Sequence, residues 1–311
     1  MNFYVGVTDN DWFRFLAQRQ PDEVNFWRPG GGSFRAIQPW EPLLFKLHSP
    51  YDYIVGGGFF VTYSRLPLSV AWEAFGPKNG APNFRTFYEQ IRQYREPRGT
   101  MRPDPDIGCI VLAQPFFFEK NNWIPMPEDW HPNIVQGKRY DAEEPIGAAV
   151  WNEVQMRLEG LTIEPAKEPV PAGVNERPRY GEEYTVRRRL GQGAFRVTVT
   201  EAYGRRCAMT GERTLPVLQA SHIKPYSESG PHRVDNGLLL RADLHILFDH
   251  GYMTLTRDYR MEASRRIKEE FENGEEYYEM HGKRLQMLPL SARDRPSAEF
   301  IDWHNENVFA P

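Results

Sequence analysis

A proline- and glycine-rich stretch past the middle of the chain most constrains what this sequence can fold into. Residues 160–183 carry four prolines, three glycines and many charges, without hydrophobic periodicity. This composition is typical of a linker. Single cores seldom grow beyond roughly 250–300 residues, and the chain has 311. The sequence therefore predicts two domains, 1–160 and 184–311, joined by a linker at 161–183.

The two predicted domains differ in composition. Of 42 Phe, Trp and Tyr residues, 28 fall within residues 1–160, together with seven of the eight tryptophans. The apolar segments there are short and bounded by Gly and Pro turns, which is typical of strands. We expect a mixed β-barrel with a few helices. The predicted strands are Met1–Val7, Pro42–Leu47, Tyr53–Tyr63 and Gly108–Ala113, and the predicted helices are Asp9–Gln20 and Phe84–Tyr94.

Composition also excludes some protein classes. No apolar stretch approaches the roughly 18–20 residues that span a bilayer, and residues 1–10 lack the pattern of a signal peptide. Cys109 and Cys207 are the two cysteines, too far apart for a CxxC metal pair or a disulfide framework. We therefore expect a cytoplasmic protein that makes no contact with membranes.

Positive charge is concentrated just after the linker. Residues 184–258 hold eleven Lys or Arg against seven Asp or Glu, although the whole chain has a net charge of −4. Residues 259–311 are acidic again, and we expect an amphipathic helix at Met261–Asn273 that packs on this domain. The basic segment is therefore where contacts with a polyanion are expected.

Three features follow one another within residues 205–251. Leu215–Ile223 reads as an apolar strand that contains His222 at its end, and Lys224–Pro225 forces an exit into a loop. Asp235–Asn236–Gly237 is a turn signal before the apolar run Leu238–Leu240. Ala242–His250 reads as a helix on which His245 and Asp249, at i and i+4, share one face. One divalent ion can bridge two side chains so placed.

The order His222, Asn236, His245 resembles the His–Asn–His nucleases of the ββα-metal class. The pattern LGQGAFR, CxxTG, SHIKP, DNGLLL, LHxLFDxG is similar to the HNH domains of modification-dependent restriction enzymes, over about residues 187–258. The resemblance implies a metal-dependent endonuclease that hydrolyses phosphodiester bonds, with Mg²⁺ or Mn²⁺ as cofactor. The implied catalytic residues are His222 (the general base), Asn236 and His245, and the implied metal ligands are His245, Asp249 and Ser221.

Other readings of these residues stay open. Many members of the family carry Asp or His where this chain has Ser221, a weaker ligand. Asp249 can instead pair with Arg241 or Arg257, and Asn236 can serve the turn alone. Cys207 is expected to be a buried small hydrophobe. His232 and His250 have no matching position and are expected to be solvated.

The segment LGQGAFRV imitates the glycine-rich loop of protein kinases, but Arg196 replaces the third glycine and the other kinase motifs are missing. We expect a helix over Phe195–Tyr203 instead. Guanidinium groups match phosphate oxygens, although a solvated basic face is the alternative. The expected DNA contacts are Arg187, Arg188, Arg189, Arg196, Lys224 and Arg241.

The N-terminal half resembles the PUA-like superfamily, which includes EVE, ASCH and SRA modules, in its short strands with WRPGG, PWEPLLFKL, YDYIVGGGFF and NIVQGKRYD. The resemblance implies recognition of modified bases, some of which are turned out of the helix. Aromatic residues of a barrel also fill its core. The candidate stacking residues are Trp27, Trp40, Tyr51, Tyr53 and Trp72.

Together these features predict an α+β chain: a PUA-like mixed β-barrel followed by a ββα-metal HNH nuclease domain with a C-terminal helical extension. We expect a modification-dependent restriction enzyme acting on double-stranded DNA with modified bases. The alternatives are a catalytically inactive module that binds modified DNA and an RNA-directed HNH nuclease. One active site holds one scissile phosphate, so cutting both strands predicts a homodimer or two successive nicks.

Overall fold

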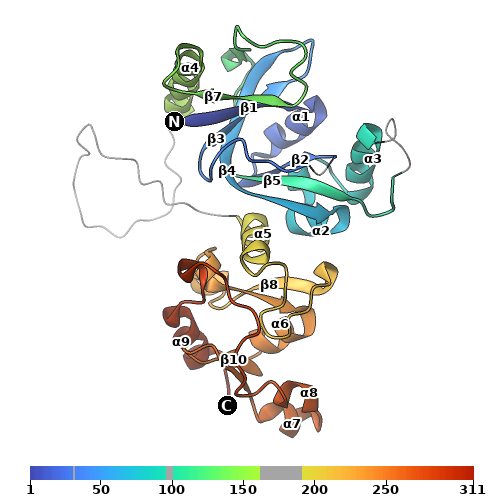
Figure 1. Ribbon diagram of the computed structural model, residues 1–311, viewed down its shortest axis with the longest axis vertical. Helices are drawn as coiled ribbons and strands as arrows, with labels where there is room; N and C mark the ends of the chain where they lie inside the picture. Colours follow the sequence, from blue (N-terminus) through green and yellow to red (C-terminus); the bar gives the residue numbers. More distant parts are fainter. Residues whose placement is uncertain (31, 96–100, 162–190) are drawn as a thin grey trace, which may run out of the picture. The chain divides into compact units, whose positions relative to one another are not determined.

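The computed structural model describes residues 1–30, 32–95, 101–161 and 191–311 (Figure 1). The predicted linker therefore lies outside the described residues, except for Leu161. The fold is mixed α+β. Its strands are β1 (Asn2–Thr8), β2 (Glu23–Arg28), β3 (Pro42–Leu47), β4 (Tyr53–Pro67), β5 (Asp106–Phe117), β6 (Ile124–Pro125), β7 (Gly137–Asp141), β8 (Leu218–His222), β9 (Gly237–Arg241), β10 (Met253–Leu255) and β11 (Met261–Ala263). Its helices are α1 (Asn10–Arg19), α2 (Leu68–Phe75), α3 (Phe84–Arg95), α4 (Pro145–Leu161), α5 (Gln192–Ala202), α6 (Ala242–Asp249), α7 (Arg266–Phe271), α8 (Glu275–Tyr278) and α9 (Ala298–Asn307).

The described chain divides into two compact units. One comprises residues 1–21, 35–60 and 114–161, and the other comprises 22–34, 61–113 and 191–311, apart from the residues outside the described set. Part of the N-terminal half is thus grouped with the C-terminal residues. The boundaries inferred from the sequence, 1–160 and 184–311, remain a prediction.

A seven-stranded sheet has the order β2-β5-β4-β3-β1-β7, with β6 paired to β4. Strand β1 runs parallel to β3, with Tyr4 opposite Leu43, and antiparallel to β7, with Tyr4 opposite Arg139. Strand β2 is antiparallel to β5, so that Trp27 faces Cys109. The pairings within the described residues give a path with β2 and β7 at its ends, and closure into a barrel remains a prediction.

Local sequence signals explain the first helices. The Asp9 side chain caps α1 by accepting hydrogen bonds from the backbone N–H groups of Asp11 and Trp12, both at 2.9 Å. Asn83 accepts from the N–H of Thr86 at 2.9 Å and so begins α3. The predicted helices therefore begin where their capping residues indicate.

The C-terminal residues 191–311 build a core around a two-stranded ribbon. Strand β8 is antiparallel to β9, with Ser221 opposite Leu238 and His222 opposite Gly237, and α6 follows β9 directly. The ribbon and α6 form the predicted ββα arrangement. Their apolar residues pack with α5, β10 and α9, and the buried set includes Phe195, Val199, Tyr203, Leu238, Leu239, Leu240, Leu244, Phe248, Met253 and Phe300. Cys207 is also buried there, as expected.

The predicted helix at Met261–Asn273 is wrong over its first part. Residues 261–263 form β11, which pairs with β10 so that Met261 faces Leu255, and the helix α7 starts only at Arg266. Both Met261 and Ala263 are buried, so pairing with β10 buries alternate side chains and overrides the helical pattern. The charged residues that suggested a helix lie mainly in α7 itself.

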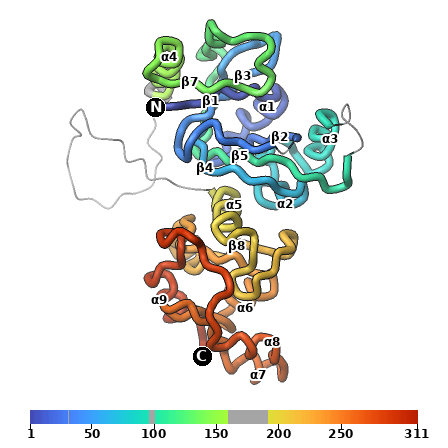
Figure 2. The backbone as a smooth tube through the Cα atoms, viewed as in Figure 1, coloured from blue at the N-terminus to red at the C-terminus, as the bar shows by residue number. Residues whose placement is uncertain are grey.

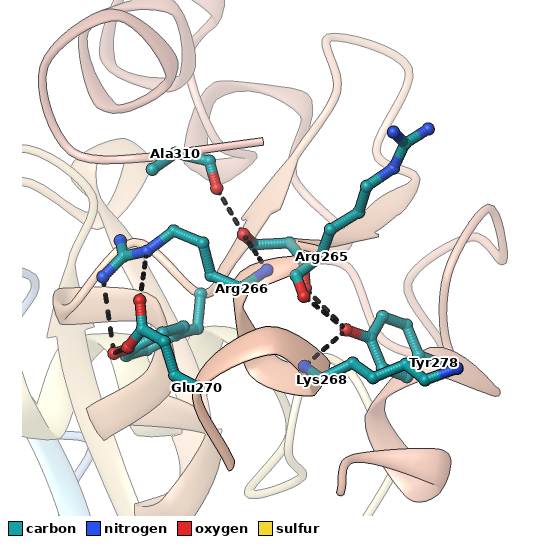
Figure 3. A network of polar contacts seen from close by, with 8 residues as sticks. Arg265, Arg266, Lys268, Glu270, Tyr278 and Ala310 are labelled. Carbon is teal, nitrogen blue, oxygen red and sulfur yellow. Dashed lines mark hydrogen bonds and ion pairs between the residues drawn. The ribbon is translucent and has the colours of Figure 1, made fainter. Parts of the chain in front are cut away.

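Hydrogen bonds anchor α7 locally (Figure 3). The Tyr278 hydroxyl donates to the carbonyl of Ser264 at 2.9 Å and accepts from the N–H of Lys268 at 3.0 Å. Arg266 pairs with Glu270 at 2.7 Å. These contacts keep α7 and α8 next to each other in the trace (Figure 2).

None of the helices in the described ranges is long and apolar enough to cross a membrane.

Candidate active site

Asn236 braces the loop that leaves β8. Its side chain is fully buried. The Oδ1 atom accepts from the N–H of Lys224 at 2.9 Å, while Nδ2 donates to the carbonyls of Lys224 and Pro231, each at 3.0 Å. All the hydrogen-bonding groups of a buried amide are thereby used to hold both ends of the 224–231 loop.

His222 ends β8, and its ring is held by aromatic stacking. Phe195 of α5 lies against it with ring centroids 3.8 Å apart and an angle of 9° between the planes. Gly237, opposite His222 in β9, leaves space for α5, because a Cβ there would lie 2.6 Å from Val199 and 3.1 Å from Phe195. The glycine therefore allows α5 to approach the ribbon closely enough to stack Phe195 on the imidazole.

The second ring contact of His222 is with His232. The Nε2 atom of His222 lies 2.9 Å from Nδ1 of His232, and Tyr226 stacks on His232 with centroids 4.6 Å apart and planes 6° apart. His232 is thus half-buried and bonded, and the expectation that it is solvated is wrong. Burial, followed by the nearby His232, lowers the pKa of His222 to about 4, and burial also lowers the pKa of His232.

His245 and Asp249 lie on one face of α6, as their spacing predicts. Nε2 of His245 is 3.1 Å from Oδ2 of Asp249, and its Nδ1 is 2.7 Å from Oε1 of Gln219. Ser221 is fully buried, and its Oγ lies 3.4 Å from Oδ1 of Asp249. If Nδ1 donates to Gln219, the lone pair of Nε2 points at a carboxylate. A cation coordinated by both atoms would then be favoured.

This donor set suits a hard divalent ion with few protein ligands. The described residues contain no group of three or more His, Cys, Asp and Glu side chains arranged to hold a metal. Mg²⁺ is commonly bound through one or two carboxylates, with waters and substrate phosphates completing its shell. His245 and Asp249 would hold such an ion, with the Ser221 hydroxyl beside Asp249.

These side chains open onto one cavity of about 550 Å³. The candidate residues that line it are His222, His245, Asp249 and Arg196, accompanied by Phe195, Gln219, Tyr226 and His304. Arg196 pairs with Glu73 at 2.9 Å. The structure thus brings together the predicted base, two of the three predicted metal ligands and one predicted phosphate contact, all within one compact unit, while Ser221 does not line the cavity.

The other predicted DNA contacts are placed differently. Lys224 lies beside the cavity-lining residues Ile223 and Pro225, with Nζ 5.3 Å from the ring centroid of Trp303. Arg241 bonds both oxygens of Asp243, at 2.7 and 2.8 Å, and Glu276 at 2.7 Å, and these carboxylates raise its pKa. A phosphate that binds Arg241 would have to displace the carboxylates of Asp243 and Glu276. Arg187, Arg188 and Arg189 lie outside the described residues.

Ring contacts hold four of the five candidate stacking aromatics. Trp27 and Trp72 both contact Phe87 of α3, at centroid distances of 6.2 and 5.9 Å. Tyr51 and Tyr53 contact Trp123, at 6.4 and 6.0 Å, and are each more than a third exposed. Trp40 is half-buried, with a positive φ of 72° and its N–H bonded to the carbonyl of Phe60. Their role as a base pocket remains a prediction.

A second cavity of about 300 Å³ lies in the unit that contains β1 and β3. Its lining includes Lys46, His48, Asp52 and Trp130, and none of the five candidate aromatics. Lys46 is 2% exposed, yet its ammonium group pairs with Asp52 at 2.5 Å and lies 5.1 Å from the ring centroid of Trp130. The cavity therefore combines an aromatic side chain with an ion pair whose lysine is buried and whose aspartate is partly exposed.

The sequence analysis missed His232, Gln219 and the Lys46 cluster. His232 lies ten residues after His222 in a loop, where spacing carries no periodic signal. Gln219 lies two residues before Ser221 in β8, so the alternation of side chains along a strand would have placed both on one face. A lysine in the middle of the apolar run Pro42–Leu47 was the available signal for Lys46, because a buried lysine needs a partner.

Comparisons with known proteins give one family match and likenesses to solved structures. Residues 207–256 match the family model described as HNH endonuclease. No curated protein matches the chain. The solved ASCH protein from Zymomonas mobilis is similar over 50% of this chain and 94% of its own, with 12% identity and a TM-score of 0.32. A structure titled modification dependent TagI restriction endonuclease is similar over 92% and 75%, with 14% identity and a TM-score of 0.28. The matched segment 207–256 contains β8, β9 and α6 with His222, Asn236 and His245, and it confirms the resemblance to HNH endonucleases.

Proposed function

We propose that the chain is a metal-dependent DNA endonuclease of the modification-dependent restriction type. The observation that carries the proposal is the cavity of about 550 Å³ into which His222, His245 and Asp249 open together. Hydrolysis of a phosphodiester needs a base for the attacking water and a cation for the developing charge. The neutral imidazole of His222 would supply the base. The pair of His245 and Asp249 would bind the cation.

His222 acts as the general base. Its Nε2 is engaged by His232, so Nδ1 is the nitrogen that accepts the proton of the attacking water. The low pKa of His222, about 4, keeps the imidazole neutral at physiological pH. His245 and Asp249 would hold a divalent ion, which would supply positive charge for the leaving oxygen.

The Lys46 cavity is the site we propose for the modified base. A base turned out of the duplex is held by a flat apolar surface and by polar groups at its edge. Trp130, which is 8% exposed, lines the cavity with its ring near Lys46, and Lys46, Asp52 and His48 offer donors and acceptors. This assignment competes with the five aromatics inferred from the sequence.

The test uses plasmids that carry unmodified, cytosine-modified or adenine-modified bases, incubated with Mg²⁺ or Mn²⁺. We expect nicked or linear products from at least one modified plasmid. His222→Ala should lose cleavage by about 10²–10⁴-fold, the usual contribution of general acid–base catalysis. The matched control is His250→Ala, since His250 is exposed and does not line the cavity.

Three outcomes would reject parts of the proposal. Binding of modified DNA with no cleavage under any metal would indicate an inactive binding module. Preferential cutting of RNA over duplex DNA would indicate an RNA-directed nuclease. Full activity of His222→Ala would remove His222 as the base.

A further inference from the structure

We propose that His232 is a positioning residue that fixes the proton of His222 on Nε2 and thereby leaves Nδ1 free to act as the base. The inference rests on the proposed nuclease function and deepens it. It starts from one contact, the 2.9 Å approach of His222 Nε2 to His232 Nδ1.

Both rings in this contact are held in place from outside. Phe195 stacks on His222 and Tyr226 stacks on His232, each nearly parallel to its imidazole. The backbone just before His232 is held as well, because Asn236 donates to the carbonyl of Pro231. Neither imidazole can turn away without losing a stacking partner. The surrounding side chains therefore hold Nε2 of His222 against Nδ1 of His232.

A hydrogen bond between two neutral imidazoles carries a single proton, which leaves two arrangements. If His232 donates, Nε2 of His222 is the acceptor, its own proton lies on Nδ1, and His222 has no lone pair left for a water proton. If His232 accepts, His222 carries its proton on Nε2, and the Nδ1 lone pair is available. Only the second arrangement supports general-base catalysis.

The same contact serves the step that follows. When Nδ1 takes the proton of the attacking water, His222 becomes an imidazolium that still donates from Nε2 to Nδ1 of His232. Burial favours the neutral form of His232, so the new charge meets a neutral acceptor and no second cation. His232 thus orients the base without touching the substrate.

Two substitutions separate the hydrogen bond from the ring. His232→Phe keeps an aromatic ring for Tyr226 and removes the acceptor nitrogen. His232→Asn removes the ring, but its side-chain oxygen occupies about the position of Nδ1. In nicking assays on the plasmid that the parent protein cuts, we expect His232→Phe to lower kcat by tenfold or more, up to the roughly 10²–10⁴-fold contribution of the base. The DNA affinity of His232→Phe should equal that of the parent protein. The kcat of His232→Asn should lie within about fivefold of the parent value, because its side-chain oxygen restores one hydrogen bond. Activity of His232→Phe within twofold of the parent, or equal losses in both variants, would overturn the proposal.

A measurement on the metal-free full-length protein is independent of cleavage. Long-range ¹H–¹⁵N spectra of the histidine rings distinguish protonation on Nε2 from protonation on Nδ1, and the signals that disappear in His222→Ala assign that ring. We expect His222 to be protonated on Nε2 in the parent protein and to populate both forms in His232→Phe. Protonation on Nδ1 in the parent protein would overturn the inference, while the nuclease proposal would still be decided by the plasmid assay.

Discussion

His222 differs from an exposed histidine mainly in its surroundings. Its ring is stacked on Phe195 and bonded to His232, and burial is the largest cause of its low pKa. Because its pKa is lowered, His222 stays neutral in weak acid. These contacts therefore keep the base form present over a wide pH range.

This environment predicts an unusual pH dependence of cleavage. The pKa of His222 is lowered to about 4, whereas an ordinary histidine titrates near ~6.5. As pH falls from 8 to 5, the base form should persist, so kcat should stay nearly constant. The measurement is single-turnover nicking at saturating Mn²⁺ at each pH, because metal ligands also bind protons. A decline in kcat with a midpoint near pH 6.5 would contradict the expectation.

The pair of His245 and Asp249 on α6 predicts that metal affinity falls by different amounts in different variants. Replacing His245 or Asp249 by Ala removes one of the two proposed protein ligands, and Gln219→Ala removes the group whose oxygen lies 2.7 Å from Nδ1 of His245. Loss of such an orienting partner typically costs roughly 10–100-fold in metal affinity, and loss of a ligand should cost at least as much. Isothermal titration with Mn²⁺ measures both, with His250→Ala as control. Parent-like affinity in all three variants would place the metal elsewhere.

At the scale of elements, β2 holds the first turn of α5, the helix whose Phe195 stacks on His222. The carboxylate of Glu23 is fully buried and accepts from the N–H groups of Gly193 and Ala194, each at 2.7 Å. It caps a helix whose own N-cap, Gly191, has no side chain to do so. Side chains at positions 191 and 193 would collide with Glu23 and Phe75. The glycines of LGQGAFR therefore serve close packing.

Glu23→Gln should reduce stability through α5. The amide keeps the size but offers one acceptor oxygen in place of two, so one buried N–H loses its partner at a cost of about 1–3 kcal/mol. Denaturant unfolding of the full chain measures the free energy of unfolding. Asp22→Asn is the matched control, because Asp22 also pairs with Lys78 but is 64% exposed, and its loss should cost under about 1 kcal/mol. Equal effects of the two substitutions would contradict the capping role.

For the whole molecule, the central question is how target choice is divided between the two cavities. The cavity with His222 holds the groups that we propose for hydrolysis, and phosphate contacts there would be indifferent to base modification. The cavity with Lys46 and Trp130 holds groups suited to a base. We therefore expect preference for modified DNA and cleavage to be lost separately on mutation.

Trp130 and Trp27 distinguish the two proposed base pockets. Stacking on an aromatic ring contributes about 1–3 kcal/mol per base, so Trp130→Leu should weaken binding of modified duplex about tenfold, with little effect on unmodified duplex. Trp130→Phe keeps an aromatic face and serves as the control. Fluorescence anisotropy in His222→Ala, which should not cut, gives the affinities. Loss of the preference in Trp27→Leu but not in Trp130→Leu would favour the pocket inferred from the sequence.

Assembly is a further property of the whole molecule. A homodimer remains a prediction, based on the need for two active sites to cut two strands. Sedimentation of the protein at micromolar concentration tests it. A monomer that accumulates nicked circles would indicate two successive cuts.

The resemblance to HNH endonucleases was predictable from the sequence because the residues that carry it lie close together along the chain. His222, Asn236 and His245 lie within a single ββα arrangement of 32 residues, from Leu218 to Asp249, where strand alternation and helical spacing alone orient the side chains. The bounds of the strand Pro42–Leu47 were predictable for the same reason. Such signals depend on neighbours along the chain.

Contacts between distant segments were decided only by the tertiary structure. His232 meets His222 because Asn236 folds the intervening loop. Glu23 caps a helix that starts 169 residues later. Residues 261–263 became a strand because β10 offered a partner. In each case the partner lies outside the element's own residues, and sequence periodicity carries no information about which segment will supply it.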